Sequence, residues 1–329
     1  MEKLLTVSVA AYNVEAYIRT TLESCVVPEI LDELEVLIVD DGATDGTVRI
    51  AEEFCAEYPG TFRLIRKENG GYGSTVNRSM EEAKGRYFRL LDGDDYFDRQ
   101  GLLSLMDAIR ACRSDWIITP IYRVPDGSDT KELHHASWES CIGHTYEMKN
   151  LPCDCIVGMW HVTVRTDVLR EHPFRLPEHT LYTDQQFVLY MMPYIKTLTL
   201  LKDPLYCYRI GRDGQSVSRE SRIRHSDETV DSMARMLRFY VKCPDITSEN
   251  RKPVTERTGM YLVFAVLTLL LGGISRKRFL QIGSLMGTAR KYAPEVYRDA
   301  LRRSDRLKLL HYTGGLAYLL MAGHVKNWV

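Results

Sequence analysis

The sequence predicts an α/β protein with a mostly parallel sheet, helices on both faces of that sheet, and a helical C-terminal appendage. Short apolar runs alternate with segments whose apolar residues recur at helical spacing. Acidic or glycine-rich turns close several of these runs. Beyond about residue 222 the pattern is helical throughout and more basic. We therefore expect one domain over residues 1–220 and a helical region over residues 221–329.

Repeated strand and helix units make up the N-terminal part of the chain. Strands are expected at residues 4–11, 34–39, 62–66, 87–91 and 116–122, with helical spacing after each of the first four. Units of this length imply parallel strands joined by crossover helices. Residues 124–161 have a weaker, loop-rich pattern, followed by a helix over 181–194 and strands at 196–201 and 205–210.

Composition narrows the classes of partner. The chain has 43 Lys and Arg residues against 44 Asp and Glu residues, a net charge of −1. Because no overall positive field favours nucleic acid, we expect no nucleic-acid partner. An apolar strand-like run begins within the first residues, without the features of a signal peptide, which predicts a cytoplasmic protein.

One C-terminal segment raises the question of a membrane. Residues 258–275 carry no charge and are flanked by Arg257 and by the basic cluster 276–278. A spanning helix needs about 20 apolar residues, so this segment is borderline. A buried helix, a helix on the membrane surface and a true span all remain open. We expect a peripheral protein at the inner face of the cell membrane.

The most informative side chains follow the predicted parallel strands. In open parallel sheets, ligands bind beyond the carboxyl ends of the strands, where residues 12–13, 40–41 and 92–95 lie. Neighbouring carboxylates repel one another unless a cation compensates. Asp92 and Asp94, two residues apart on a glycine-containing turn, could both face Mg²⁺ or Mn²⁺ bridging a diphosphate. They are the candidate metal ligands.

A second carboxylate at a strand end has a different expected role. Asp41 could accept the imide N–H of a uracil ring. Asp45, a few residues later, is expected to cap the helix that begins near Thr47.

Three ordered segments carry a family resemblance. Residues 7–13 (VSVAAYN), 39–45 (VDDGATD) and 91–95 (LDGDD) resemble the signature segments of family 2 glycosyltransferases, which are inverting enzymes of the Rossmann-like GT-A fold. The resemblance covers about residues 4–218. The sequence departs from the family pattern at Ala10, where Pro or Thr is frequent, and at Ala43, where Ser is commoner.

The resemblance implies roles for individual residues. Asp184, in the segment 181–187, would be the general base, and Asp95 would be structural. Asp94 would bind the metal, and Asp92 would position the ribose and diphosphate. The remaining donor-binding candidates are Ala10, Tyr12, Asn13, Asp41, Asn77 and Arg209, with Arg212 as an alternative to Arg209 for the diphosphate.

Structural alternatives stand beside some of these roles. A helix dipole alone favours a first-turn carboxylate such as Asp184. Trp160 could line an acceptor pocket or belong to the core. The glycine-rich turn at residues 70–73 lacks the spacing of a dinucleotide or P-loop motif, so Gly71 is only a weak donor-site candidate.

The expected function is transfer of a sugar from a nucleotide-diphospho-sugar, with UDP as the expected nucleotide and Mn²⁺ or Mg²⁺ as cofactor. The expected acceptor is a glycan or a polyprenyl-linked glycan in cell-surface polysaccharide synthesis. The alternative is a non-catalytic protein of the same fold that binds sugar nucleotides or acts as a scaffold.

Overall fold

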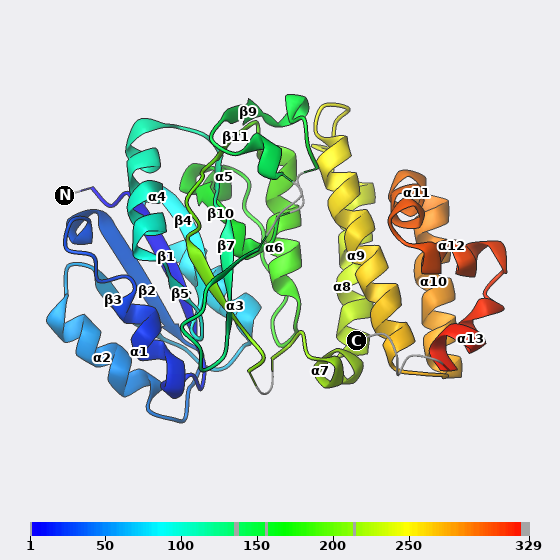
Figure 1. Cartoon of the computed structure of the whole chain (residues 1–329), viewed down its shortest axis with the longest axis horizontal. Coiled ribbons are helices and arrows are strands. Elements are labelled where there is room, and N and C mark those ends of the chain that lie inside the picture. Colours follow the sequence, from blue (N-terminus) through cyan, green and yellow to red (C-terminus); the bar gives the residue numbers. More distant parts are fainter. Residues whose placement is uncertain (1, 135–137, 155–156, 213–214, 324–329) are drawn as a thin grey trace. The chain divides into compact units, whose positions relative to one another are not determined.

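A computed structural model describes residues 2–134, 138–154, 157–212 and 215–323. The chain divides into two compact units, residues 1–212 and 213–329. The first unit contains the strands together with helices α1 to α6, and the second is helical. Figure 1 shows the elements of both units.

The larger sheet has eight strands in the order β3-β2-β1-β4-β10-β6-β11-β9. The first four in this order pair in parallel, as the apolar runs predicted. Strand β10 is antiparallel to both neighbours, and β9 is an antiparallel edge. The bounds are β1 Leu5–Ala11, β2 Leu34–Asp40, β3 Phe62–Arg66, β4 Tyr87–Asp92, β6 Trp116–Ile118, β9 Thr145–Glu147, β10 Val162–Arg165 and β11 Thr197–Leu200. The predicted fold class is confirmed.

Helices cover both faces of this sheet (Figure 1). Strands β1, β2 and β3 follow one another in one direction along the sheet, so right-handed crossovers place α1 and α2 on one face. The chain then returns to β4, on the other side of β1, so the crossover places α3 on the opposite face. In agreement, α1 contacts α2, and α3 contacts α6. The bounds are α1 Glu15–Glu23, α2 Thr47–Glu57, α3 Tyr72–Glu82, α4 Arg99–Ala111, α5 Thr166–Glu171 and α6 Thr183–Met191.

A smaller sheet, in the order β5-β12-β7-β8, was not expected from the sequence. Its strands are β5 Tyr96–Phe97, β7 Ile121–Pro125, β8 Glu132–His134 and β12 Tyr206–Ile210. The single strand predicted at residues 116–122 is wrong, because that segment divides into β6 and β7 in different sheets. Pro120 lies at the division, and a residue without a backbone N–H cannot continue a ladder in the middle of a sheet.

The second unit is built around α9. This helix packs against α8, α10 and α11. It is long and apolar enough to cross a membrane, but 72% of its apolar 18-residue window is buried within the fold, as in a core helix. The uncharged segment 258–275 lies mainly in this helix. The bounds are α7 Arg219–Arg224, α8 Ser226–Lys242, α9 Arg251–Leu271, α10 Arg276–Tyr292, α11 Pro294–Arg303, α12 Asp305–Tyr312 and α13 Ala317–Gly323.

Candidate active site

The site begins where the strand order reverses, between β1 and β4. These neighbours are in register, with Ala10 opposite Asp92. The backbone N–H of Gly93 donates to the carbonyl of Ala10 at 3.1 Å. A Cβ at position 93 would lie only 2.5 Å from that carbonyl oxygen, so a glycine is required. The reversal opens a crevice at the carboxyl ends of both strands, which is where such sheets bind ligands.

The turn after β4 gathers three carboxylates. Asp92, Asp94 and Asp95 each offer an oxygen, and these oxygens lie within 4.8 Å of one another. Burial, followed by the charge of Asp94, raises the pKa of Asp92 to about 8. Its Oδ1 is buried and accepts no hydrogen bond from the described part of the chain. A hard divalent cation fits this arrangement, because it takes oxygen ligands and stabilises ionised carboxylates.

Asp95 is buried and fixes the turn. Its Oδ2 accepts from the hydroxyl of Tyr206 at 2.8 Å, and its Oδ1 accepts from the backbone N–H of Arg209 at 2.8 Å. The same Tyr206 hydroxyl accepts from the backbone N–H of Asp92 at 3.1 Å. These contacts tie the acidic turn to β12 and give Asp95 a structural role.

Two arginines at the end of β12 differ in what they contact. Arg212 forms an ion pair with Asp94, Nη2 to Oδ2 at 2.6 Å. The guanidinium of Arg209 lies over the rings of Tyr17 and Tyr96, at 5.3 and 5.1 Å from their centres. Arg212 also lies over the Tyr17 ring, at 5.5 Å from its centre. Both arginines thus pack on aromatic rings, and the ion pair brings Arg212 to the acidic turn, where it could also meet a diphosphate.

Asp41, at the end of β2, is buried and holds several donors. Its Oδ1 accepts from the backbone N–H of Gly70 at 2.9 Å, from Lys67 Nζ at 2.6 Å and from Ser74 Oγ at 3.2 Å. Its Oδ2 accepts from the backbone N–H of Gly71 at 2.8 Å. Oδ2 takes fewer donors than Oδ1 within the described part of the chain, and it could accept one more, such as a base imide.

The loop after β1 joins the loop after β2. Asn13 has a positive φ of 51°. Its Oδ1 accepts from the backbone N–H of Thr44 at 2.8 Å. Tyr12 is half exposed beside it, at 50%. Asn13 therefore ties the loop after β1 to the loop that follows Asp41.

The glycine-rich turn at residues 70–73 allows the backbone around Pro177 to pack closely against it. A Cβ at Gly73 would lie 2.1 Å from the carbonyl oxygen of Pro177. The backbone N–H of His179 donates to the carbonyl of Gly70 at 2.6 Å. Asn77 holds the same segment, because its amide both donates to and accepts from the backbone of Leu176, at 3.0 and 2.8 Å. These contacts give Asn77 a structural role and do not support a nucleotide contact.

Asp184 lies in the first turn of α6, directly after this segment. Burial raises the pKa values of Asp92 and Tyr72, and the charge of Asp184 adds to both shifts, so Asp184 lies within electrostatic reach of both groups. Tyr182 just before it has a positive φ of 61°; Asn13 and His179 are the other non-glycine residues with positive φ in the described part of the chain. Such backbone strain clusters at functional sites.

Comparison with known proteins identifies the family. The sequence model of the family described as glycosyl transferase family 2 matches residues 6–172. The chain belongs to glycosyltransferase family 2. Its matched segment includes Asp41, Asp92 and Asp94, and it ends before Asp184.

Two relatives of this family 2 chain come from Bacillus subtilis. The putative glycosyltransferase EpsH of Bacillus subtilis is 29% identical over 215 residues, 61% of this chain and 59% of that protein. The minor teichoic acid biosynthesis protein GgaB of the same species is 25% identical over 62% of this chain, but only 23% of its own length. The chain thus spans about three-fifths of EpsH and under a quarter of GgaB.

Solved structures share the fold at low identity. TarS 1-349 of S. aureus in complex with UDP-GlcNAc aligns with a TM-score of 0.57 at 17% identity, covering 94% of this chain and 92% of that one. The mannosyltransferase PcManGT of Pyrobaculum calidifontis in complex with GDP-Man and Mn²⁺ aligns with a TM-score of 0.55 at 16% identity, covering 100% and 88%.

Sequence reasoning missed several residues of this family 2 site. Lys67, which donates to Asp41, lies in no sequence pattern that would have indicated its role. Arg89 is a lone cation within the apolar run of β4, which was a usable signal. Its buried guanidinium donates to the carbonyl of Trp160 at 2.5 Å and to Thr163 Oγ1 at 2.8 Å, and burial lowers its pKa to about 9. Trp160, thereby fixed, stacks on Tyr208 at 5.3 Å between ring centres.

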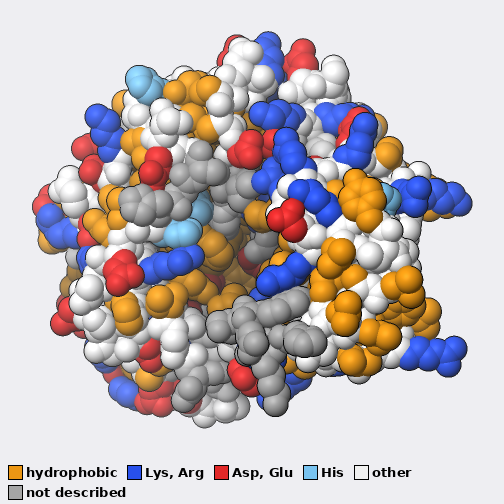
Figure 2. Space-filling view, turned by 45° about the vertical axis from the view of Figure 1, so that its right-hand side comes forward, with side chains coloured by type: hydrophobic (Ala, Val, Ile, Leu, Met, Phe, Trp, Pro, Cys, Tyr) orange, Lys and Arg blue, Asp and Glu red, His pale blue; other side chains and the backbone are white. Residues whose placement is uncertain are grey.

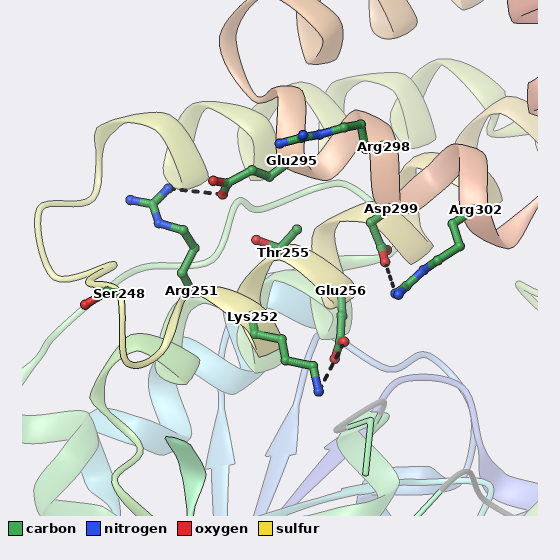
Figure 3. A pocket seen from close by; sticks show the side chains of 9 residues that line it. All are labelled: Ser248, Arg251, Lys252, Thr255, Glu256, Glu295, Arg298, Asp299 and Arg302. Atoms are coloured by element: carbon green, nitrogen blue, oxygen red, sulfur yellow. Dashed lines mark hydrogen bonds and ion pairs between the residues drawn. The ribbon is translucent and has the colours of Figure 1, made fainter. Parts of the chain in front are cut away.

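A separate hollow of about 500 Å³ lies in the helical unit, between α9 and α11. Its charged side chains pair with one another, at 3.4 Å for Arg251 and Glu295, 3.8 Å for Lys252 and Glu256, and 2.6 Å for Arg302 and Asp299 (Figure 3). Pairs of this kind account for most of its charges, so it is not a second candidate for the site.

Proposed function

We propose that this family 2 chain transfers a sugar, with inversion, from a UDP-sugar to a hydroxyl of a glycan or polyprenyl-linked acceptor. The observation that carries the proposal is the buried Oδ1 of Asp92, which accepts no hydrogen bond from the described residues. It lies beside Asp94, at the strand-order reversal and within electrostatic reach of Asp184. The TarS and PcManGT structures hold nucleotide-sugars in the same fold, which supports this class of donor.

The donor half of the site has separate places for base and diphosphate. The free capacity of Asp41 Oδ2 suits the imide of uracil. Asp92 and Asp94 would hold Mn²⁺ or Mg²⁺, which neutralises charge developing on the leaving diphosphate. Arg212, already at Asp94, would donate to the diphosphate oxygens.

The transfer step is a single displacement. The acceptor oxygen forms a bond to the anomeric carbon from the face opposite the diphosphate, and Asp184 takes the acceptor proton. The bond from the anomeric carbon to the diphosphate oxygen breaks, and UDP leaves with the electron pair. The half-buried position of Asp184, near Asp92, suits a base that must reach the reacting centre.

The name of one relative points to the acceptor. GgaB is described as a minor teichoic acid biosynthesis protein. This name is consistent with a step in cell-surface polymer synthesis. A polymer precursor on a polyprenyl carrier would supply the acceptor hydroxyl.

Turnover of a UDP-sugar panel with Mn²⁺ tests the proposal. Asp184→Asn should keep UDP affinity within about threefold and lose about 10²-fold or more in turnover, the usual contribution of a general base. Asp94→Asn should lose both turnover and the dependence on Mn²⁺. Asp107→Asn, a change at an exposed carboxylate on α4, is the matched control and should behave like the wild type.

The same experiment separates the alternative function. A non-catalytic binding protein would bind a UDP-sugar with Mn²⁺ but turn over none of the panel, with or without polyprenyl-linked acceptors. Asp184→Asn would then change nothing measurable. Turnover that depends on Asp184 excludes that alternative.

A further inference from the structure

The helical unit exposes a set of large apolar side chains on α10, α12, α13 and the turn between α12 and α13. Figure 2 shows hydrophobic side chains gathered on the right-hand surface, with Lys and Arg side chains among them. Tyr312, Leu316 and Leu320 are 80%, 81% and 69% exposed. We name this set the leucine face; its members are Leu280, Leu309, Tyr312, Leu316, Leu319 and Leu320.

Helix α13 is apolar on both of its sides. Tyr318 and Met321 are buried, while Leu319 and Leu320 point outward. A surface helix of a soluble domain normally carries polar residues on its outer side. Contiguous exposed apolar surface marks an interaction site. The leucine face therefore calls for a partner that accepts apolar side chains.

An apolar groove borders this face. It has a volume of about 200 Å³ and lies between α10, α11 and α12. Phe279, Ile282 and Met286 line it. Phe279 also packs on the Tyr318 ring, 5.3 Å between centres, which joins the groove to α13. An acyl chain matches such a narrow apolar groove in chemistry.

The charges of α10, one of the helices that border the groove, have one sign. Every charged residue of α10 is a Lys or an Arg. Arg276, Leu280 and Arg290 recur at helical spacing and are exposed, so cations and leucine share one side of the helix. Arg290 also lines the groove. A second copy of the chain would bring the same positive charges to a shared interface, whereas anionic headgroups neutralise them.

We propose that the leucine face and the cations of α10 dock this unit on an anionic lipid bilayer. The leucines enter the boundary between headgroups and acyl chains, and Arg276 and Arg290 contact the headgroups. Helix α9 stays buried in the unit and does not cross the bilayer. This proposal stands independently of the transfer reaction, because it rests on residues of the second unit alone.

Sedimentation of the full chain with vesicles tests the proposal. The wild type should bind vesicles containing phosphatidylglycerol at least tenfold more strongly than pure phosphatidylcholine vesicles, and less strongly at higher salt. Leu316→Glu with Leu320→Glu should weaken binding at least tenfold. The matched control, Ala234→Glu with Val241→Glu, adds the same charges at exposed positions of α8 and should weaken it less than threefold.

A second variant keeps the test informative if the leucine variant is poorly folded. Arg276→Gln with Arg290→Gln should reduce binding to phosphatidylglycerol vesicles severalfold and leave the weak binding to phosphatidylcholine unchanged. Equal effects of the leucine variant and its α8 control would overturn the proposal. The proposal would also be overturned if the wild type bound no vesicles but formed a dimer, and if Leu316→Glu with Leu320→Glu dissociated that dimer. Asp94→Asn should bind vesicles like the wild type, whatever its turnover.

Discussion

Replacing Tyr206 with Phe removes one hydroxyl that joins the acidic turn to β12. The hydroxyl donates to Asp95 Oδ2 at 2.8 Å and accepts from the backbone N–H of Asp92 at 3.1 Å. The ring itself is fully buried and packs edge-on against Phe97, so Phe preserves the packing. The variant therefore isolates the two hydrogen bonds.

The expected loss in the free energy of unfolding follows from the two kinds of hydrogen bond that are removed. A bond to a charged group contributes about 1.5–3 kcal/mol, and a neutral bond about 1 kcal/mol. The loss of both predicts about 3 kcal/mol of stability. For a unit of this size that corresponds to roughly 6–12 °C in the unfolding midpoint. Mn²⁺ affinity in the presence of UDP should fall severalfold as well, because the turn that carries Asp92 and Asp94 loosens.

Thermal unfolding and Mn²⁺ titration provide the assay. Tyr87→Phe is the matched control, since that buried hydroxyl donates to a neutral group, the carbonyl of Ser114, at 2.8 Å. The control should lose about 1 kcal/mol and keep its Mn²⁺ affinity. If Tyr206→Phe costs no more than Tyr87→Phe and binds Mn²⁺ equally well, Tyr206 does not hold the acidic turn.

Two further predictions concern the scaffold. Gly73→Ala should lower the free energy of unfolding, measured with denaturant, by more than about 2 kcal/mol, because the new Cβ meets the Pro177 carbonyl at 2.1 Å. Gly60→Ala, where the Cβ would enter open space, should lower it by under about 1 kcal/mol. Equal losses in the two variants would contradict this reasoning. Asp98 caps α4. Burial acts to raise the pKa of Asp98, but hydrogen bonds from Lys131 and from backbone N–H groups outweigh burial and lower this pKa. A lowered pKa stabilises the fold above about pH 4, and this stability is lost as pH falls through the folded value. Asp98→Ala should therefore cost about 1 kcal/mol at pH 7 and little at pH 2, and a cost independent of pH would refute this.

The periodicity of the sequence was sufficient to predict the strands of the parallel half of the larger sheet. Apolar runs that end in polar, acidic or glycine-rich turns located β1 to β4. The carboxyl ends of those strands placed Asp41, Asp92 and Asp94 at one edge of the sheet. Local pattern carries no information on pairing direction, so the antiparallel insertion of β10 between β4 and β6 could not be predicted.

Contacts distant in sequence were also beyond prediction. Asp41 meets Lys67, and Asp95 meets Tyr206, at separations of 26 and 111 residues. No local spacing rule links such pairs. The glycine-rich turn is a similar case: its composition was visible, but its purpose, a close approach by the backbone around Pro177, depends on the tertiary fold.

Calorimetric titration of UDP with and without Mn²⁺ tests the central claim most directly. For the wild type, Mn²⁺ should strengthen UDP binding at least tenfold, because the carboxylates of Asp92 and Asp94 hold the cation that bridges the diphosphate. In Asp94→Asn this gain should fall below about threefold, since one charged ligand is lost. Equal gains in both proteins, or none in the wild type, would contradict a metal-assisted donor site on this turn.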